Sequence, residues 1–303
     1  MPRPPLTAQA KPWRRLWAYL LERFPPAPYT LLVALFYGSA VLVCSRLSGI
    51  EPVFHWQAPV VILLLFFHLR VFDEQKDFAE DQQAHPDRLL SQGIVTLPFL
   101  TKSAIVAILV QAGLAASLGT QALLAWACCL LFTLTMRFEF GVGPWLNQHP
   151  LLYALTHNPI TPLLGVFAWA STDAPWAPMY GWYLGTVAMG ALAFELGRKI
   201  RLPDEEQEGV NTYSKSFGRK TACSWMLLAS LLTIALAVPV IDVLAVETSG
   251  GFGRLEFLSY FFLVSPGIQT FSAALRGASA KGMENAGTAM LLGAFGAFGV
   301  IAW

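Results

Sequence analysis

About nine stretches of the sequence are apolar over the roughly 20 residues that a helix needs to cross a lipid bilayer. Hydrophobic residues make up 55% of the 303 residues and charged residues only 13%, whereas about a quarter of an ordinary soluble domain is charged. The composition excludes a soluble protein and predicts an all-α, polytopic membrane bundle. The expected span cores are 29–47, 55–72, 95–118, 121–136, 150–171, 177–197, 222–246, 255–275 and 285–303.

Lysine and arginine collect in alternate connections between these spans, as they do on the cytoplasmic side of membrane proteins. The other connections, near residues 119–120, 172–176 and 247–254, carry almost no positive charge. This alternation predicts an odd number of spans, with the N-terminus in the cytoplasm and the C-terminus on the opposite side. We expect an integral membrane protein of the bacterial inner membrane.

The first 28 residues are basic and proline-rich, and they lack the apolar core and cleavage site of a signal peptide. Within residues 1–28, apolar and charged residues alternate from Leu16 to Phe24, which predicts an amphipathic helix at the membrane interface. Its expected role is anchoring, and closure of a site mouth is the alternative. Residues 29–303 form the membrane domain. The net charge of +1 and the scattered cysteines indicate neither a nucleic-acid partner nor a disulfide framework.

An acidic segment follows the second span directly and reads Asp73-Glu74-Gln75-Lys76-Asp77-Phe78-Ala79-Glu80-Asp81. If the helix continues, Asp73, Asp77 and Asp81 fall on one face at i, i+4 and i+8, where like charges repel. A cation removes that repulsion, and Mg²⁺ typically takes one or two carboxylates and completes its shell with water and substrate phosphates. The segment therefore predicts metal-bridged phosphate. The alternative is a solvated, charged helix end.

A second charged connection follows the sixth span and runs from Glu195 through Arg198, Lys199 and Arg201 to four acids that begin at Asp204. Arginine offers a bidentate fork to diphosphate oxygens, and lysine offers a compact charge. The acids are candidates for a second cation site. The alternative is ordinary positive charge flanking a span, with local salt bridges.

The pattern Asp73-Glu74-x-x-Asp77-x-x-x-Asp81, followed by Pro86-x-Arg88-x-x-x-x-Gly93, resembles the first aspartate-rich motif and downstream loop of the UbiA superfamily of intramembrane prenyltransferases. That motif reads Asn-Asp-x-x-Asp-x-x-x-Asp, so Asp73 stands at the Asn position and Glu74 at the first Asp. The second motif of the family departs further. Gly209 and Thr212 fit its trailing part and Glu205 its second Asp, but Arg201 stands at its first Asp.

The resemblance implies a divergent member with nine helices and a cytoplasmic cap over a central pocket. It implies a Mg²⁺-dependent prenyltransferase that ionises a prenyl diphosphate and transfers the prenyl group to a small-molecule acceptor, aromatic or other. The implied catalytic residues are Asp73, Asp77 and Asp81. The implied diphosphate-binding residues are Lys76, Arg88, Arg198, Lys199 and Arg201. The implied metal ligands are Asp73, Glu74, Asp77, Asp81, Glu195, Asp204 and Glu205.

Polar residues inside predicted spans are costly and are therefore candidates for function. Arg137 and Glu139 end the fourth span, and His157-Asn158-Pro159 interrupts the fifth. We expect His157 and Asn158 to contact an acceptor. A proline-kinked helix whose freed carbonyls these two residues satisfy is the equal alternative.

Two other functions fit parts of the sequence. A terpene cyclase of the same superfamily would ionise the same diphosphate without an acceptor, which the altered second motif permits. A transporter would show internal repeats and polar breaks at mid-span, whereas the acids here stand at span ends. We therefore expect a transferase, with the cyclase as the alternative.

Overall fold

The computed structural model describes residues 7–206, 210–249 and 253–303, and all regular structure in those ranges is helical. Gly209, which the second motif would use, lies outside the described residues. The longer helices are α1 (Pro12–Arg23), α2 (Pro26–Leu47), α3 (Gln57–Lys76), α5 (Leu97–Ser117), α6 (Thr120–Arg137), α9 (Ile160–Ala170), α10 (Tyr180–Arg198), α12 (Arg219–Ser249), α13 (Arg254–Leu275) and α14 (Ala280–Ile301). Four short helices are α4 (Phe78–Ala84), α7 (Gly143–Leu146), α8 (Pro150–His157) and α11 (Tyr213–Phe217).

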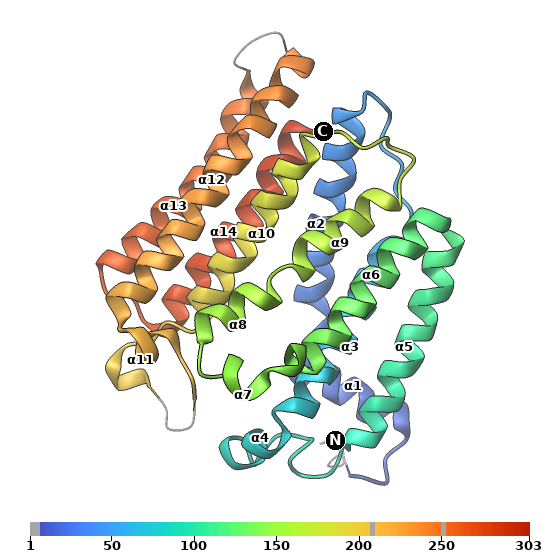
Figure 1. Ribbon diagram of the computed structural model, residues 1–303, viewed down its shortest axis with the longest axis vertical. Coiled ribbons are helices and arrows are strands. Elements are labelled where there is room, and N and C mark those ends of the chain that lie inside the picture. Colours follow the sequence, from blue (N-terminus) through green and yellow to red (C-terminus); the bar gives the residue numbers. More distant parts are fainter. Residues whose placement is uncertain (1–6, 207–209, 250–252) are drawn as a thin grey trace, which may run out of the picture.

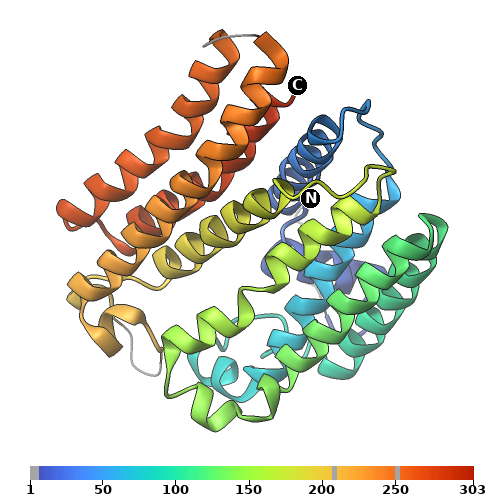
Figure 2. The same cartoon turned by 45° about the horizontal axis from the view of Figure 1, so that its top comes forward.

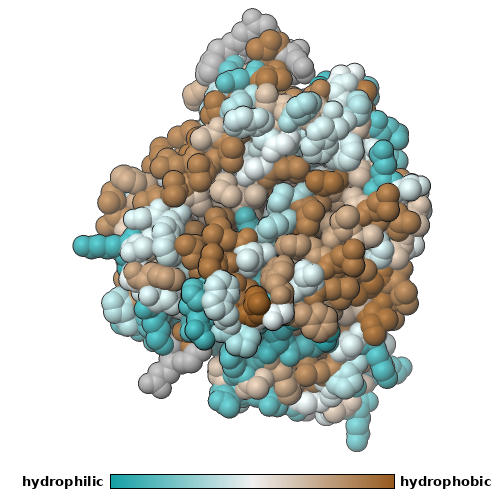
Figure 3. All heavy atoms as spheres, viewed as in Figure 1, coloured by the Kyte–Doolittle hydropathy of each residue, from teal (hydrophilic) through white to brown (hydrophobic). Residues whose placement is uncertain are grey.

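Among the described residues, six helices are long and apolar enough to cross a membrane, namely α2, α5, α6, α12, α13 and α14. Their outer faces expose large apolar side chains, and Figure 3 shows brown surface over α5, α6 and α12. The chain is therefore an integral membrane protein. The other three expected spans are helical as well, but α3 and α10 end in charged residues and the fifth is divided into α8 and α9. The count of nine spans stays a prediction.

The helices form two groups that meet along α2, α9 and α10 (Figures 1 and 2). One group packs α12 and α14 against α10, with α13 against α14 and α12. The other group packs α3 against α5 and α6 against α9. The first expected span also contacts the last, because α2 packs on α14. There the Arg46 guanidinium donates to the carbonyl oxygens of Ala302 and Trp303 at 2.9 and 2.7 Å.

The short helices α4, α7, α8 and α11 gather at one end of the bundle (Figure 1). The N-terminal helix α1 lies at this end too, with Tyr19 and Phe24 buried. It contacts the connection before α5, where Arg15 donates to the Ile94 carbonyl at 2.6 Å and Glu22 accepts the Leu89 N–H. The expected N-terminal helix is thus present and tied to the bundle. Its place at a membrane interface, and the cytoplasmic side of this end, stay predictions.

One buried polar cluster within the second group satisfies its own hydrogen bonds. The His68 ring of α3 lies 3.0 Å from the Thr133 hydroxyl and 3.1 Å from the Gln111 amide, and Gln111 accepts the Trp126 indole N–H at 3.2 Å. Because each group has a partner, the cluster avoids the cost of unpaired polar atoms in an apolar interior. It joins α3, α5 and α6.

Glycines allow α14 to approach its neighbours closely, and the tightest of them gives a stability prediction. A Cβ at Gly293 would lie 2.5 Å from the Phe262 carbonyl oxygen of α13. We expect Gly293→Ala to destabilise the protein by about 1–3 kcal/mol, because the helices must separate to admit the methyl group. Thermal unfolding in detergent measures the effect. Gly113→Ala in α5, where nothing lies within 4 Å, is the matched control and should not lower the midpoint.

Candidate functional site

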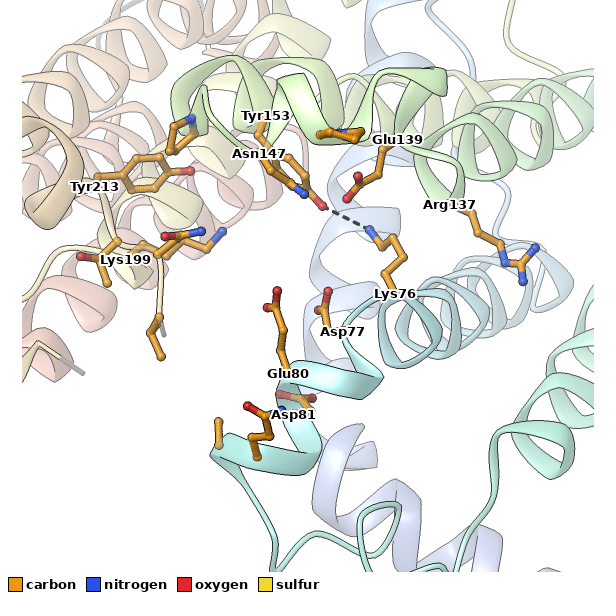
Figure 4. Close-up of a pocket in the computed structure, with 18 of the residues that line it drawn as sticks. Lys76, Asp77, Glu80, Asp81, Arg137, Glu139, Asn147, Tyr153, Lys199 and Tyr213 are labelled. Atoms are coloured by element: carbon orange, nitrogen blue, oxygen red, sulfur yellow. Dashed lines mark hydrogen bonds between the residues drawn. The ribbon is translucent and has the colours of Figure 1, made fainter. Parts of the chain in front are cut away.

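A cavity of about 1110 Å³ opens at the end of the bundle where α4, α7, α8 and α11 gather. Its lining includes many charged and amide side chains and comes from both helix groups (Figure 4). The ionisable and amide residues that line it are Lys76, Asp77, Glu80, Asp81, Gln83, His85, Arg137, Glu139, Asn147, Tyr153, Lys199, Asn211 and Tyr213. A polar cavity of this size beside membrane helices suits the charged head of an amphiphilic substrate.

The acidic segment does not run as one helix. The α3 helix ends at Lys76, Asp77 caps it, and α4 begins at Phe78. Because backbone hydrogen bonds still join Asp77 to Asp73 and Asp81 to Asp77, the break changes only the direction of the chain. It brings Asp77, Glu80 and Asp81 to the cavity wall.

Asp73 and Glu74 do not line the cavity. Asp73 is half-exposed and pairs with Lys76 at 3.2 Å. The Glu74 carboxylate is buried and accepts from the guanidinium groups of Arg23 at 2.8 Å and Arg70 at 2.9 Å, with the Tyr19 hydroxyl at 3.4 Å. Glu74 therefore fastens α1 to α3, and Oε1 of its carboxylate is already engaged.

Two arginines hold Asp81 from outside the cavity. Arg88 forms a close ion pair with it, and Arg23 lies 3.6 Å away. Arg88 does not line the cavity itself, so the structure places it as the partner of an acid there.

Two lysines lie close to the same aromatic ring. The Lys76 ammonium donates to the Tyr153 hydroxyl at 3.2 Å and lies 5.8 Å from the centre of that ring. Lys199 lies 5.8 Å from the ring centres of both Tyr153 and Tyr213. Two cations and two phenols thus converge on one wall (Figure 4), which is a suitable arrangement for phosphate oxygens.

Asp77 is electrostatically distinct from its neighbours. Loss of hydration, together with the charge of Asp73, raises its pKa to about 6, and nearby Lys76 only partly opposes this. Among described residues, no lysine or arginine nitrogen lies within 4.0 Å of the Asp77 or Glu80 carboxylate. These two acids are therefore available to a cation.

Of the charged residues that the structure describes in the second charged connection, Lys199 alone lines the cavity. Glu195 pairs with Arg198 at 2.6 Å and with Lys199 at 2.9 Å, and Asp204 is exposed. Glu205 accepts the backbone N–H groups of Leu202 and Ala280 at 3.0 and 2.7 Å. The predicted metal ligands of this connection are thus engaged in pairing, capping or solvent contact.

Arg201 and Glu206 brace the same loop. The Arg201 guanidinium lies 3.4 Å from the Glu205 carbonyl oxygen, and the Arg201 backbone N–H donates to the Ser214 hydroxyl. Glu206, which the sequence analysis did not single out, accepts from the Thr212 and Ser214 hydroxyls. These bonds fix the chain between α10 and α11, which positions Tyr213.

His157 and Asn158 stand at the break between α8 and α9. The His157 ring stacks on Tyr153 with 4.0 Å between centres, and its Nδ1 lies 2.8 Å from the Tyr153 carbonyl. Asn158 donates to the Ala188 carbonyl of α10 at 2.9 Å. Neither residue lines the cavity, and both make the contacts expected of a proline-interrupted helix. Acceptor contact stays a prediction.

Several lining residues were not among the predicted site residues. Glu80 lies inside the acidic segment and Glu139 ends the fourth expected span, so their positions gave a signal. Asn147, Asn211 and Tyr213 gave none, because no local pattern distinguishes them from ordinary loop residues.

Mg²⁺ fits the acids of this cavity, although not as a closed cage. Within the part of the chain that the structure describes, no three His, Cys, Asp or Glu side chains converge closely enough to hold a metal alone. Mg²⁺ commonly uses only one or two carboxylates and takes its other oxygens from water and phosphate. The unpaired carboxylates of Asp77 and Glu80, which point into the same space, match that requirement (Figure 4).

Comparison with known proteins places the fold. No protein-family model and no curated protein matches the sequence. A solved structure described as concerning digeranylgeranylglyceryl phosphate synthase in membranes is similar over 94% of this chain and 99% of that chain, with 14% identity and a TM-score of 0.62. At that identity the likeness concerns architecture. The chain has the helical membrane fold of that synthase.

Proposed function

We propose that this protein is an intramembrane prenyltransferase that binds the head of a prenyl diphosphate in the cavity and transfers the prenyl group to a small acceptor. The observation that carries the proposal is the meeting of unpaired carboxylates with two lysines in one cavity beside apolar helices. The fold supports it, since the similar structure is described as a synthase of digeranylgeranylglyceryl phosphate, a product that bears prenyl groups. We propose that the cavity faces the cytoplasm.

Different residues would bind the diphosphate oxygens and the metal ion. Lys76, Lys199 and the Tyr153 hydroxyl would donate to its oxygens, and Asp73 orients Lys76 through their ion pair. Asp77 and Glu80 would hold Mg²⁺, which when bound supplies charge that stabilises the departing diphosphate. Arg23 and Arg88 keep Asp81 at the wall.

The second charged connection would then bind no second metal. Its described acids are paired, capping, bonded to hydroxyl groups or exposed to solvent, and Lys199 brings positive charge to the cavity. The absence of a second metal agrees with the sequence, in which Arg201 stands where the second motif of the family has its first Asp. The polar groups of Asn147 and Asn211 favour a polar acceptor, so we propose a transferase and not a cyclase.

Pyrophosphate release tests the function directly. The purified protein in detergent is incubated with farnesyl and geranylgeranyl diphosphate and Mg²⁺, first alone and then with candidate acceptors and membrane lipid. Release that requires an acceptor supports a transferase, and release without one, with a hydrocarbon product, identifies a cyclase. Folded protein that neither releases pyrophosphate nor binds a prenyl thiodiphosphate would contradict both.

The raised pKa of Asp77 predicts a pH dependence of metal binding. A cation must displace the proton, so Mg²⁺ affinity falls as the pH drops through about 6. With that pKa, we expect apparent affinity at pH 5 to be about tenfold weaker than at pH 7.5. Calorimetric titration of the protein with Mg²⁺ measures it. Asp77→Asn should flatten the profile, and a profile that stays steep in this variant would assign the proton elsewhere.

A further inference from the structure

The connection between α6 and α7 carries an unusual backbone. Glu139 and Phe140 have φ values of 49° and 56°, and they are the non-glycine residues with positive φ in the described parts of the chain. Gly141 follows with a φ of 75°. Such conformations cost energy in residues with a Cβ and persist where the surrounding structure holds them. The turn they make directs the Glu139 carboxylate back into the cavity (Figure 4).

A glycine makes room for this carboxylate. A Cβ built at the buried Gly143 would lie 2.1 Å from Glu139 Oε2 and 3.2 Å from Glu139 Cδ. Any side chain at this position would therefore displace the carboxylate. In the structure it packs against bare backbone and lies on the wall opposite Asp77 and Glu80 (Figure 4).

The Glu139 carboxylate also has no cationic partner within 4.0 Å among the described residues, unlike Asp73, Asp81 and Glu195. An ionised carboxylate only accepts hydrogen bonds, and it binds O–H donors strongly. Glu139 is thus an acceptor without a donor, aimed at the space beside the proposed diphosphate site.

Resting on the proposed function, we propose that Glu139 is the catalytic base and that the acceptor is a hydroxyl compound whose O–H donates to it. In the reaction, the bond between C1 of the prenyl group and the diphosphate oxygen breaks, and its electron pair leaves with the diphosphate. The acceptor oxygen forms the new bond to C1. Its proton passes to the Glu139 carboxylate, so the products are a prenyl ether and diphosphate.

A hydroxyl acceptor suits a carboxylate that has no other donor. A hydroxyl group presents its proton to a carboxylate before bond formation, whereas an aromatic carbon offers none until it has been alkylated. Asn147 lies on the same side of the cavity and can bind further polar groups of such a compound (Figure 4).

The test separates ionisation from proton removal. Wild type, Glu139→Gln and Gly143→Ala are compared with geranylgeranyl diphosphate and geranylgeranylglyceryl phosphate as a hydroxyl probe, its deoxy analogue and 4-hydroxybenzoate, with products identified by mass spectrometry. Affinity for geranylgeranyl thiodiphosphate is measured in parallel. We expect Glu139→Gln to lower kcat for ether formation about 100-fold and to leave thiodiphosphate affinity within about twofold.

Gly143→Ala should lower the same kcat by a smaller factor, about tenfold, because it displaces the carboxylate without removing it. Glu139→Asp should recover part of the activity, and Glu284→Gln, an exposed acid paired with Lys281, should match wild type. Unfolding midpoints close to that of wild type would exclude misfolding.

Three outcomes would overturn the inference. These are full ether formation by Glu139→Gln, loss of thiodiphosphate affinity in that variant, or a wild-type product joined only through carbon. A wild-type protein that binds no thiodiphosphate and releases no pyrophosphate with any acceptor would instead remove the proposed function, and this inference with it.

Discussion

Replacing Asp77 by Asn is expected to lower Mg²⁺-dependent pyrophosphate release about 1,000-fold, at the upper end of the loss for one electrostatic group in an active site. Asp77 lines the cavity, has no lysine or arginine nitrogen within 4.0 Å among the described residues, and stands at the junction of α3 and α4. The substitution keeps the shape and the size of the side chain. The loss should therefore come from charge alone, and a pyrophosphate assay at saturating Mg²⁺ measures it.

Asp204→Asn is the matched comparison. Asp204 belongs to the second charged connection, is exposed and does not line the cavity, so we expect activity within about twofold of wild type because surface changes of this kind have small effects. A large loss at Asp204 with little change at Asp77 would reverse the assignment of the two acidic regions.

Glu74→Ala is expected to cause the largest loss of stability, about 2–3 kcal/mol in the free energy of unfolding. The Glu74 side chain is only 1% exposed, and its removal leaves Arg23 and Arg70 without their shared partner. Because both arginines are about one-fifth exposed, they can turn towards water, which keeps the loss below that of a fully buried pair. Thermal unfolding in detergent measures the change.

Glu284→Ala is the control, because its pair with Lys281 lies at the surface and should contribute less than about 1 kcal/mol. If Glu74→Ala unfolds at the wild-type temperature but loses Mg²⁺ binding, Glu74 would be a metal ligand, as the sequence motif predicts, and not a structural tie.

The helical membrane fold could be predicted because long apolar runs have few alternatives in a bilayer. Within the described parts of the chain, however, the criterion of length and hydropathy selects six spans, and it passes over α3, the α8–α9 pair and α10. These are the elements that bring charge or a break to the site. Span counting is therefore least certain where the function lies, since the residues that serve the site lower the apolar signal.

The candidate site was predictable only where chemistry is dense in the sequence. The acidic segment drew attention to Asp77 and Asp81, and to Lys76 as the lysine within it. It could not separate Asp77 from Glu74, because the partners of Glu74 lie in α1 and on the preceding turn of α3. Which acids pair and which stay open depends on tertiary contacts.

The second charged connection illustrates the same limit. Its acids suggested a metal site, but Glu205 accepts the backbone N–H groups of Leu202 and of Ala280, which is 75 positions away. The importance of Glu139 depends on backbone conformation and on packing. The turn at Glu139 has positive φ values, and Gly143 leaves room for the carboxylate. Both features are visible only in the three-dimensional structure.

The contact of Arg46 with Ala302 and Trp303 has a consequence for biosynthesis. The partners are separated by 256 and 257 positions, and ribosomes add about 5–20 residues per second, so α2 waits about 13–50 s for this contact. Until α14 emerges, the face of α2 that packs on it must be covered by lipid or by other proteins of the insertion machinery. Nascent chains that stop before α14 should therefore be the preferred targets of membrane proteases.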